Sequence, residues 1–357
     1  MSFVNMSDDQ KVGKLGYVPE LDGLRALAVF MVMLAHSNIY FGSNGGIGVD
    51  VFFALSGFLI TTLIFEELET FSKFNFKYFY ARRFLRLFPA LFILLIVSSV
   101  IVIFFFKESF SIFFQEIIVS FFYLYNISWY WGIATEPFML IHMWSLGVEE
   151  QYYIWWPFVI VFLSKSINNR VLSLILLFLS IIIFSFSFYL QNYLFFNSIF
   201  MDSIFFGSVL GLLRKNFSLA FMENNAVMLF SLMLLLVFSI IDFEFISKLI
   251  KDGYRGIFGF LTCLVIINFV SKDQNSVIKR LFRSNFPVFI GKLSYSLYLW
   301  HVIVFVCFRE LNIFEPYLNY LLKFFISFIA ASISYYCIEL RFLKLSKSRY
   351  SVKYKLV

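Results

Sequence analysis

Charged side chains are scarce in this sequence. Only 14% of its 357 residues are Asp, Glu, Lys or Arg, whereas 61% are hydrophobic and the mean hydropathy is +0.84. Soluble domains usually have about 25% charged residues and about 45–50% apolar ones. Residues 171–201 contain no charged side chain, and that run is longer than the roughly 20 residues that cross a bilayer as a helix. The scarcity excludes an ordinary soluble enzyme and predicts an all-α, polytopic integral membrane protein.

Long polar segments are also missing, so the chain has no room for a soluble domain of ordinary size. We expect a cytoplasmic N-terminal arm at 1–23, one transmembrane domain at 24–340 and a basic cytoplasmic tail at 341–357. The first seventeen residues are polar and lack the apolar stretch and the small-residue cleavage site of a signal peptide. The first span is therefore expected to serve as an uncleaved insertion signal.

Cysteine is rare and shows no metal-binding pattern. Cys263, Cys307 and Cys337 lie in or beside apolar segments, without CxxC or Cys/His spacing, so we interpret them as small core residues. We expect neither a disulfide nor a bound metal. No internal repeat is visible either, and this does not favour a transporter built from inverted repeats.

Charge-poor segments predict about ten membrane-spanning helices. They cover residues 24–41, 49–65, 87–106, 143–163, 171–191, 196–213, 225–241, 255–270, 287–307 and 318–339. An eleventh apolar stretch, 117–133, is rich in Tyr and Trp. These residues gather at membrane interfaces, so it is predicted to be interfacial or re-entrant. With both termini in the cytoplasm, 23 of the 29 Lys and Arg residues face the cytoplasm, where basic residues of membrane proteins concentrate. The net charge of +7 is thus mostly a topology signal, and no nucleic-acid partner is expected.

Ionisable residues within the predicted spans mark candidate functional sites, because they are costly there and usually face a cavity or a partner. Arg25 and His36 lie in the first span, about 16 Å apart along the helix axis. Glu149 and Glu150 lie in the fourth span and His301 in the ninth, at a predicted depth similar to that of His36. A buried carboxylate and an imidazole at one level can orient and exchange protons, but adjacent glutamates cannot share one helix face. The alternative interpretations are snorkelling of Arg25, packing of His36 and structural pairing.

Arginines cluster just before the third span, in the sequence FYARRFLRLFPA. Arg83 and Arg86 are three residues apart and therefore share a helix face, with Arg82 beside them. Arginine pairs bind phosphates through bidentate hydrogen bonds, and Pro89 is expected to fix the start of the helix. The alternative is a positively charged membrane anchor.

A glycine-rich segment leads into the second span, in the sequence GSNGGIGVDVFFALSGFLIT. It contains Asp50, and the pair Ser56 and Gly57 interrupts the apolar run. Such a small pair permits close helix approach. Alternatively, it makes room for an extended acyl thioester.

Taken in their order, these motifs resemble those of the membrane acyltransferase-3 family, whose bacterial members acylate sugars of surface polysaccharides. The matching elements are Arg25-x10-His36, GVDVFFALSGFLI, RRFLRLFP, WSLGVEEQYY and SYSLYLWH. The likeness extends over essentially the whole chain. Tyr152-Tyr153 stands where the family commonly has Phe-Tyr, which is a mild departure.

The resemblance implies transfer of an acyl group, usually acetyl, from cytoplasmic acetyl-CoA to a sugar hydroxyl on the opposite side of the membrane. It implies that His36 is the leading catalytic residue and Arg25 its motif partner, and it associates Arg83 and Arg86 with the CoA side. It also implies positioning or catalytic roles for Glu149, Tyr153, Tyr295 and His301. From the residues themselves we add Asp50 as a catalytic candidate, Arg82, Ser56 and Gly57 as donor-binding candidates, and Gln151 and Tyr298 as substrate-positioning candidates.

We expect His36 to remove the proton from the sugar hydroxyl as that hydroxyl attacks the thioester, or else to carry the acyl group as an acyl-histidine. Glu149 or Asp50 would orient the imidazole. Because the chain ends soon after its tenth span, the membrane domain is expected to pass the acyl group directly to the acceptor.

The protein is expected to lie in the bacterial cytoplasmic (inner) membrane, in contact with its lipids. Its acceptor is expected to be a surface polysaccharide or a lipid-linked glycan. The O-antigen of lipopolysaccharide is favoured over peptidoglycan and exopolysaccharide. A proton-coupled transporter or a lipid-linked sugar flippase is the competing function, and it would need neither the arginine cluster nor CoA.

Overall fold

The computed structural model describes residues 14–37, 44–134, 138–190, 202–240, 255–271, 276–311 and 316–350, and within these ranges it contains helices and turns but no strand. The expected all-α class is confirmed for that part of the chain. The helices are α1 (Pro19–His36), α2 (Ile47–Phe71), α3 (Phe76–Phe105), α4 (Phe110–Phe121), α5 (Tyr125–Ser128), α6 (Met143–Ser166), α7 (Asn169–Leu190), α8 (Asp202–Asn216), α9 (Asn225–Ile240), α11 (Gly256–Val270), α12 (Val277–Phe282), α13 (Asn285–Leu311), α14 (Pro316–Ser334) and α15 (Leu340–Arg349). Short turns of other helix types are η2 (Lys107–Ser109), η3 (Trp129–Trp131) and the π-helical η5 (Tyr335–Glu339).

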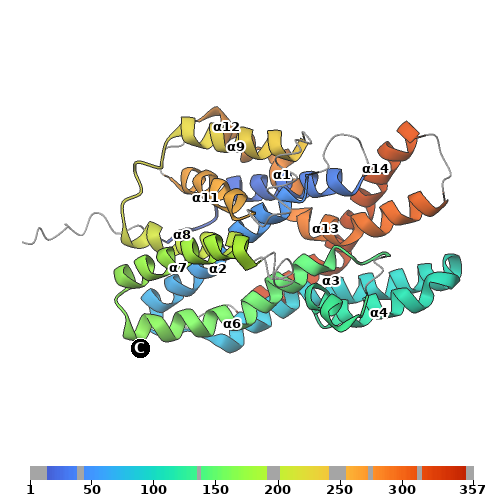
Figure 1. Cartoon of the computed structure of the whole chain (residues 1–357), viewed down its shortest axis with the longest axis horizontal. Helices are drawn as coiled ribbons and strands as arrows, with labels where there is room; N and C mark the ends of the chain where they lie inside the picture. Colours follow the sequence, from blue (N-terminus) through green and yellow to red (C-terminus); the bar gives the residue numbers. More distant parts are fainter. Residues whose placement is uncertain are drawn as a thin grey trace, which may run out of the picture.

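The helices lie mostly along the long axis of the molecule. Figure 1 shows α1, α2 and α13 in the middle, with α9 and α12 on one side and α3 and α6 on the other. The most extensive packing joins α2 to α8 and α1 to α13. The first, second and ninth predicted spans, which carry several candidate site residues, therefore form the centre of the bundle.

Four of the described helices are long and apolar enough to cross a membrane, namely Ile47–Phe71, Phe76–Phe105, Asn285–Arg309 and Leu318–Arg349. Shorter apolar helices cover Asn169–Ser185, Asn225–Ile240 and Gly256–Val270. Each of the ten predicted spans overlaps a described helix, although 196–213 begins outside the described residues. Helices α1 and α6 carry three charged residues each: Glu20, Asp22 and Arg25 in α1, and Glu149, Glu150 and Lys165 in α6. Ten crossings with both termini in the cytoplasm stays a prediction.

Helices α2 and α8 approach each other through paired glycines. A Cβ added to Gly57 would lie 1.8 Å from the Ile204 carbonyl oxygen, and one on Gly207 would lie 2.0 Å from the Ala54 carbonyl oxygen. Any side chain there would push the two backbones apart. The close-approach interpretation of Gly57 is confirmed, and its role is packing against α8.

Helix α3 begins thirteen residues before Pro89, so the prediction that this proline fixes the start of the helix was wrong. The start is fixed by Asn75, whose side-chain oxygen accepts a hydrogen bond from the Tyr78 backbone N–H at 3.0 Å. Pro89 lies inside the helix. The arginines at 82, 83 and 86 therefore lie within a continuous helix, which fixes their relative directions.

The aromatic segment predicted at 117–133 is divided between α4, α5 and η3. Glu116 of α4 is fully buried and accepts hydrogen bonds from the Tyr125 hydroxyl at 2.7 Å and from the backbone N–H groups of residues 138–140 at 2.9–3.0 Å. This carboxylate ties together the irregular chain that leads into α6. An interfacial position for the segment stays a prediction.

Residues 316–349 form one continuous helical rod, α14, η5 and α15, and α15 packs on α3. Most of the predicted basic tail is therefore helical and belongs to the bundle, while residues 351–357 lie outside the described part.

Candidate active site

A cavity of about 610 Å³ lies between α1, α2, α3, α6, α13 and α15. Residues of α2 line it from Val49 to Phe71, which is a rise of roughly 33 Å along that helix. The cavity is therefore long and narrow enough to hold an extended molecule, and its chemistry changes along its length.

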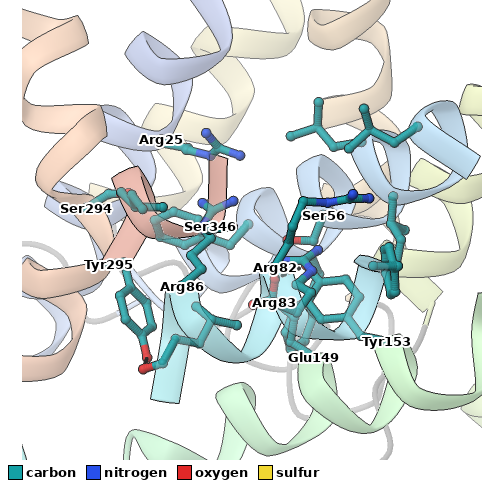
Figure 2. Close-up of a pocket in the computed structure, with 18 of the residues that line it drawn as sticks. Arg25, Ser56, Arg82, Arg83, Arg86, Glu149, Tyr153, Ser294, Tyr295 and Ser346 are labelled. Atoms are coloured by element: carbon teal, nitrogen blue, oxygen red, sulfur yellow. Dashed lines mark hydrogen bonds between the residues drawn. The ribbon is translucent and has the colours of Figure 1, made fainter. Parts of the chain in front are cut away.

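Four arginines line one part of the cavity. Arg25 comes from α1, and Arg82, Arg83 and Arg86 come from α3, as Figure 2 shows. Arg82 forms an ion pair with Glu67 at 3.7 Å and donates to the Tyr350 carbonyl oxygen at 2.9 Å. Arg25 forms an ion pair with Asp22 at 3.0 Å. Arg83 and Arg86 are three residues apart within the continuous helix α3 and both line the cavity, so their predicted shared face is confirmed.

Further charges lie in the same lining: the cations Lys14 and Lys347 and the carboxylates Glu66 and Glu67. Both carboxylates have partners on the protein. Glu66 accepts a hydrogen bond from the Leu15 backbone N–H at 2.6 Å, and Glu67 accepts one from the Asn75 backbone N–H at 2.7 Å. Basic groups outnumber acidic ones in this part of the cavity, which suits an anionic ligand.

Glu149 lies in the cavity wall with Ser56, Tyr153 and Arg83 (Figure 2). The Ser56 hydroxyl donates a hydrogen bond to Glu149 Oε1 at 2.5 Å, and the Tyr153 hydroxyl donates to the same oxygen. The Arg83 guanidinium lies over the Tyr153 ring, 3.5 Å from its centroid. This group joins α2, α3 and α6, so it fixes the width of the cavity at this level.

The hydroxyls of Ser145 and Tyr298 line another part of the cavity. They are 2.5 Å apart, and Tyr298 also donates a hydrogen bond to the His142 carbonyl oxygen at 2.7 Å. The Tyr298 ring is 5.7 Å from the ring of His301 and 5.5 Å from that of His142, between centroids. The cavity thus reaches to within one side chain of a group of histidines.

All three histidines of the chain meet at this place. The ring centroids of His36 and His301 are 5.1 Å apart, and those of His142 and His301 are 5.4 Å apart. Nε2 of His301 lies 3.2 Å from Nδ1 of His36. His301 and His142 are buried, whereas His36 is exposed at the end of α1. His36 and His301, predicted only to reach a similar depth, are in contact, and His142 joins them.

Hydrogen bonding fixes the tautomers of the pair, because carbonyl oxygens only accept. Nδ1 of His301 lies 2.8 Å from the Tyr298 carbonyl oxygen, so Nδ1 carries the hydrogen and Nε2 is bare. Nδ1 of His36 lies 3.0 Å from the Val32 carbonyl oxygen, so it also carries a hydrogen and shares it with the bare Nε2 of His301. Nε2 of His36 is then the unprotonated nitrogen. It can act as a base or a nucleophile.

Several predicted site residues have partners away from the histidines. Asp50 forms an ion pair with Arg255 at 2.9 Å and accepts a hydrogen bond from Ser203 at 3.1 Å. Its predicted role of orienting the imidazole is not supported, because the pair with Arg255 occupies it. Glu149, the other residue predicted for that role, bonds to Ser56 and Tyr153 instead.

Two substrate-positioning candidates also hold the fold. Gln151 bonds to the Asn126 side chain at 2.9–3.0 Å and to the Tyr123 carbonyl oxygen at 2.8 Å, and it does not line the cavity. Tyr295 lines the cavity while its hydroxyl donates to the Leu87 carbonyl oxygen at 2.8 Å. Gly57 is absent from the cavity lining, whereas its neighbour Ser56 belongs to it.

Sequence reasoning missed His142, Ser145 and the lysines at 14 and 347. His142 stands in the irregular chain before α6 rather than in a predicted span, so no depth was assigned to it. A signal was present nonetheless: the chain has only three histidines, and the other two are candidate site residues. Among the described residues, no group of three or more His, Cys, Asp or Glu is arranged to hold a metal ion.

Comparison with known proteins identifies the type of domain. A family model described as an acyltransferase domain matches residues 18–338. The chain belongs to the membrane acyltransferase-3 family. No solved structure is significantly similar to this acyltransferase.

Two relatives are named provisionally as O-acetyltransferases, from Staphylococcus aureus strain COL and strain MSSA476. Each is 33% identical over 360 residues, covering 94% of this chain and 58% of the relative. A third, named O-acetyltransferase OatA, from S. aureus strain NCTC 8325 / PS 47, is 30% identical over 348 residues, covering 90% of this chain and 57% of the relative. The acyltransferase thus spans somewhat more than half the length of these relatives.

Proposed function

We propose that this acyltransferase is an O-acetyltransferase that moves an acetyl group from cytoplasmic acetyl-CoA to a sugar hydroxyl of a surface polysaccharide on the other side of the membrane. One observation carries the proposal: a long cavity, lined by four arginines, reaches to within one side chain of the His36–His301 pair. The names of the relatives support an acetyl group as the cargo.

The donor would occupy the cavity with its phosphates among the arginines. Arg83 and Arg86 share one face of α3, and guanidinium groups bind phosphate oxygens through paired hydrogen bonds. Arg25 approaches the same space from α1, so the phosphates would be held from two helices. The pantetheine arm would then extend along α2 past Ser56 towards Ser145 and Tyr298.

The acetyl carbonyl would have to pass the Ser145–Tyr298 pair to meet His36. These hydroxyls are hydrogen-bonded to each other and line the cavity, whereas none of the three histidines does. We infer that the pair separates when the donor is loaded.

His36 would act as the general base through its bare Nε2. It would take the proton of the sugar hydroxyl as that oxygen attacks the thioester carbonyl. The carbon–sulfur bond would then break, and the leaving thiolate would take the proton from the His36 imidazolium. His301 would position His36, because its bare Nε2 accepts the Nδ1–H of His36 in both protonation states.

The acceptor would reach His36 at the exposed end of α1. With the predicted N-in topology and ten crossings, this end is extracytoplasmic and the arginines are on the cytoplasmic side. In a bacterial inner membrane the acceptor would be a surface polysaccharide or its lipid-linked precursor, and the O-antigen of lipopolysaccharide is the first candidate to test.

The decisive experiment uses purified protein in liposomes loaded with acetyl-CoA, comparing wild type with His36→Ala. We expect CoA release coupled to acetylation of an added glycan in the wild type and neither in the variant. Mass spectrometry of surface glycans from cells with and without the gene would identify the acceptor. Transport of a sugar across the membrane without acetyl-CoA consumption would refute the proposal in favour of a transporter.

A further inference from the structure

Lys323 is a buried cation that the proposed mechanism does not use. It lies on α14 with only 6% of its surface exposed. Its Nζ lies 5.9 Å from the centroid of the Phe305 ring and 5.5 Å from that of Tyr320. Within the described part of the chain no carboxylate forms an ion pair with it. Most of the lysine is covered by the fold, and among the described residues its cationic end lies near aromatic rings rather than an anion.

Among the described residues, a second cation also acts on Lys323. Arg309 of α13 is close enough for the two like charges to interact. It is one helical turn beyond Phe305, and Phe305 is one turn beyond His301. Residues four apart share a helix face, so His301, Phe305 and Arg309 form one stripe along α13. Lys323 faces the middle of that stripe.

Lys323 is connected to the histidines through a single side chain. The centroids of the Phe305 and His301 rings are 5.8 Å apart, and Nζ of Lys323 lies 5.9 Å from the centroid of the same Phe305 ring. One helical turn separates His301 from Phe305, a rise of roughly 6 Å. Taken together, the ring contacts place the Lys323 ammonium at most about 17 Å from the His36 ring. Lys323 is absent from the lining of the donor cavity, so donor phosphates do not explain it.

We propose that Lys323 is the anion-binding residue of the acceptor subsite, and that the acceptor glycan carries a carboxylate or a phosphate within a few sugar residues of the hydroxyl that is acetylated. The inference rests on the proposed function. The anion would bind Lys323, with Arg309 adding positive potential at the same end of α13. It would hold the glycan so that the hydroxyl to be acetylated meets Nε2 of His36.

The test compares three tetrasaccharides as acceptors for protein in a phosphate-free detergent: a hyaluronan tetrasaccharide, its carboxyl-reduced form, and that reduced form with one primary hydroxyl phosphorylated. Variants are Lys323→Met, Lys323→Arg and, as the control, Lys107→Met, which alters an exposed lysine on η2. We expect the wild-type KM to be at least about tenfold lower for a charged acceptor than for the neutral one, because a charge-assisted hydrogen bond is among the strongest. K323M should lose this preference, K323R should retain most of it, and K107M should match the wild type.

The two charged acceptors separate the sources of the anion. A preference for the uronate alone assigns a carboxylate, and a preference for the phosphorylated form assigns a phosphate. Reconstitution with and without phosphatidylglycerol tests a lipid headgroup: a Lys323-dependent change of KM with lipid, but no preference among glycans, would overturn the acceptor subsite.

Failure of this inference differs from failure of the proposed function. Acetyl transfer with equal KM for charged and neutral acceptors, or a charge preference that survives in K323M, would overturn the subsite while leaving the O-acetyltransferase intact. Absence of transfer to any glycan in the wild type would overturn both. If K323M does not fold, equal wild-type KM values for the three acceptors would still overturn the subsite, and retention of the charge preference in K323R would support it.

Discussion

Replacing His301 tests the tautomer assignment directly. The amide oxygen of a glutamine can occupy the position of imidazole Nε2. The amide of the shorter asparagine reaches only the position of Nδ1. His301→Gln therefore keeps an acceptor for the Nδ1–H of His36, at the position that now lies 3.2 Å away. His301→Asn removes it. Both variants remove the same ring, so their difference reports the hydrogen bond rather than the packing.

The size of the effect follows from the charge that His36 acquires. When Nε2 takes the sugar proton, Nδ1–H belongs to an imidazolium, and a hydrogen bond to a charged group contributes about 1.5–3 kcal/mol. Since about 1.4 kcal/mol corresponds to a tenfold change in rate, we expect H301N to lower kcat by about 10- to 150-fold. H301Q should retain most of the activity. The KM for acetyl-CoA should change little, because His301 does not line the cavity.

The assay is steady-state acetyl transfer in liposomes, with kcat and the KM for acetyl-CoA measured separately. His36→Ala gives the lower limit, a loss of about 10²- to 10⁴-fold, the usual contribution of general acid–base catalysis. His142→Gln is the matched control: it keeps a donor for the Leu299 carbonyl oxygen, and it should stay near the wild-type rate. Equal activities of H301N and H301Q, or a loss confined to KM, would refute the positioning role.

Three further predictions test the cavity and the packing that forms it. Arg83→Ala and Arg86→Ala should each raise the Kd for CoA by about tenfold or more through loss of a charge-assisted hydrogen bond. The control Arg170→Ala alters an exposed arginine and should leave this Kd unchanged. Unchanged CoA affinity of the Arg83 and Arg86 variants in titrations would reduce the cluster to a membrane anchor. Ser346→Trp would project a large ring into the cavity from α15 and should abolish CoA binding. The control Ser348→Trp, on the exposed face of the same helix, should be tolerated. Equal CoA affinities of the two variants would show that α15 does not form a wall of the donor site. Gly57→Ala should destabilise the protein by about 1–3 kcal/mol through overpacking against Ile204. A Cβ at Gly46 would meet nothing closer than 3.9 Å, so the control Gly46→Ala should leave the melting temperature nearly unchanged. Equal melting temperatures of the two variants would contradict the close approach of α2 and α8.

Much of the arginine part of the site follows from local sequence. The spacing of Arg83 and Arg86 places both on one face wherever that segment is helical. The N-cap of α3 was harder to predict from sequence than its arginine face. Proline is the stronger sequence signal for a helix start, but Pro89 lies inside this helix, well beyond the cap residue Asn75. The helix therefore begins earlier than expected, and its arginines are held more rigidly.

The roles of the carboxylates depended on packing that the sequence does not display. Asp50 and Glu149 both looked available to orient an imidazole. Their partners come from distant segments: Arg255 precedes α11, and Ser56 lies on α2. The residue that contacts His36 is instead another histidine, since His301 reaches it through the packing of α13 on α1.

Composition alone predicted a helical membrane protein, because a long charge-free run can be solvated by lipid whatever its neighbours are, and four of the described helices are long and apolar enough to cross a membrane. The order of its motifs likewise indicated the acyltransferase family. Only the tertiary structure brought the three histidines together, closed the cavity with α15 and left Lys323 facing the histidine end of α13. Those features join segments that lie far apart in the chain, and their meeting depends on how helix faces pack, which no local pattern of residues specifies.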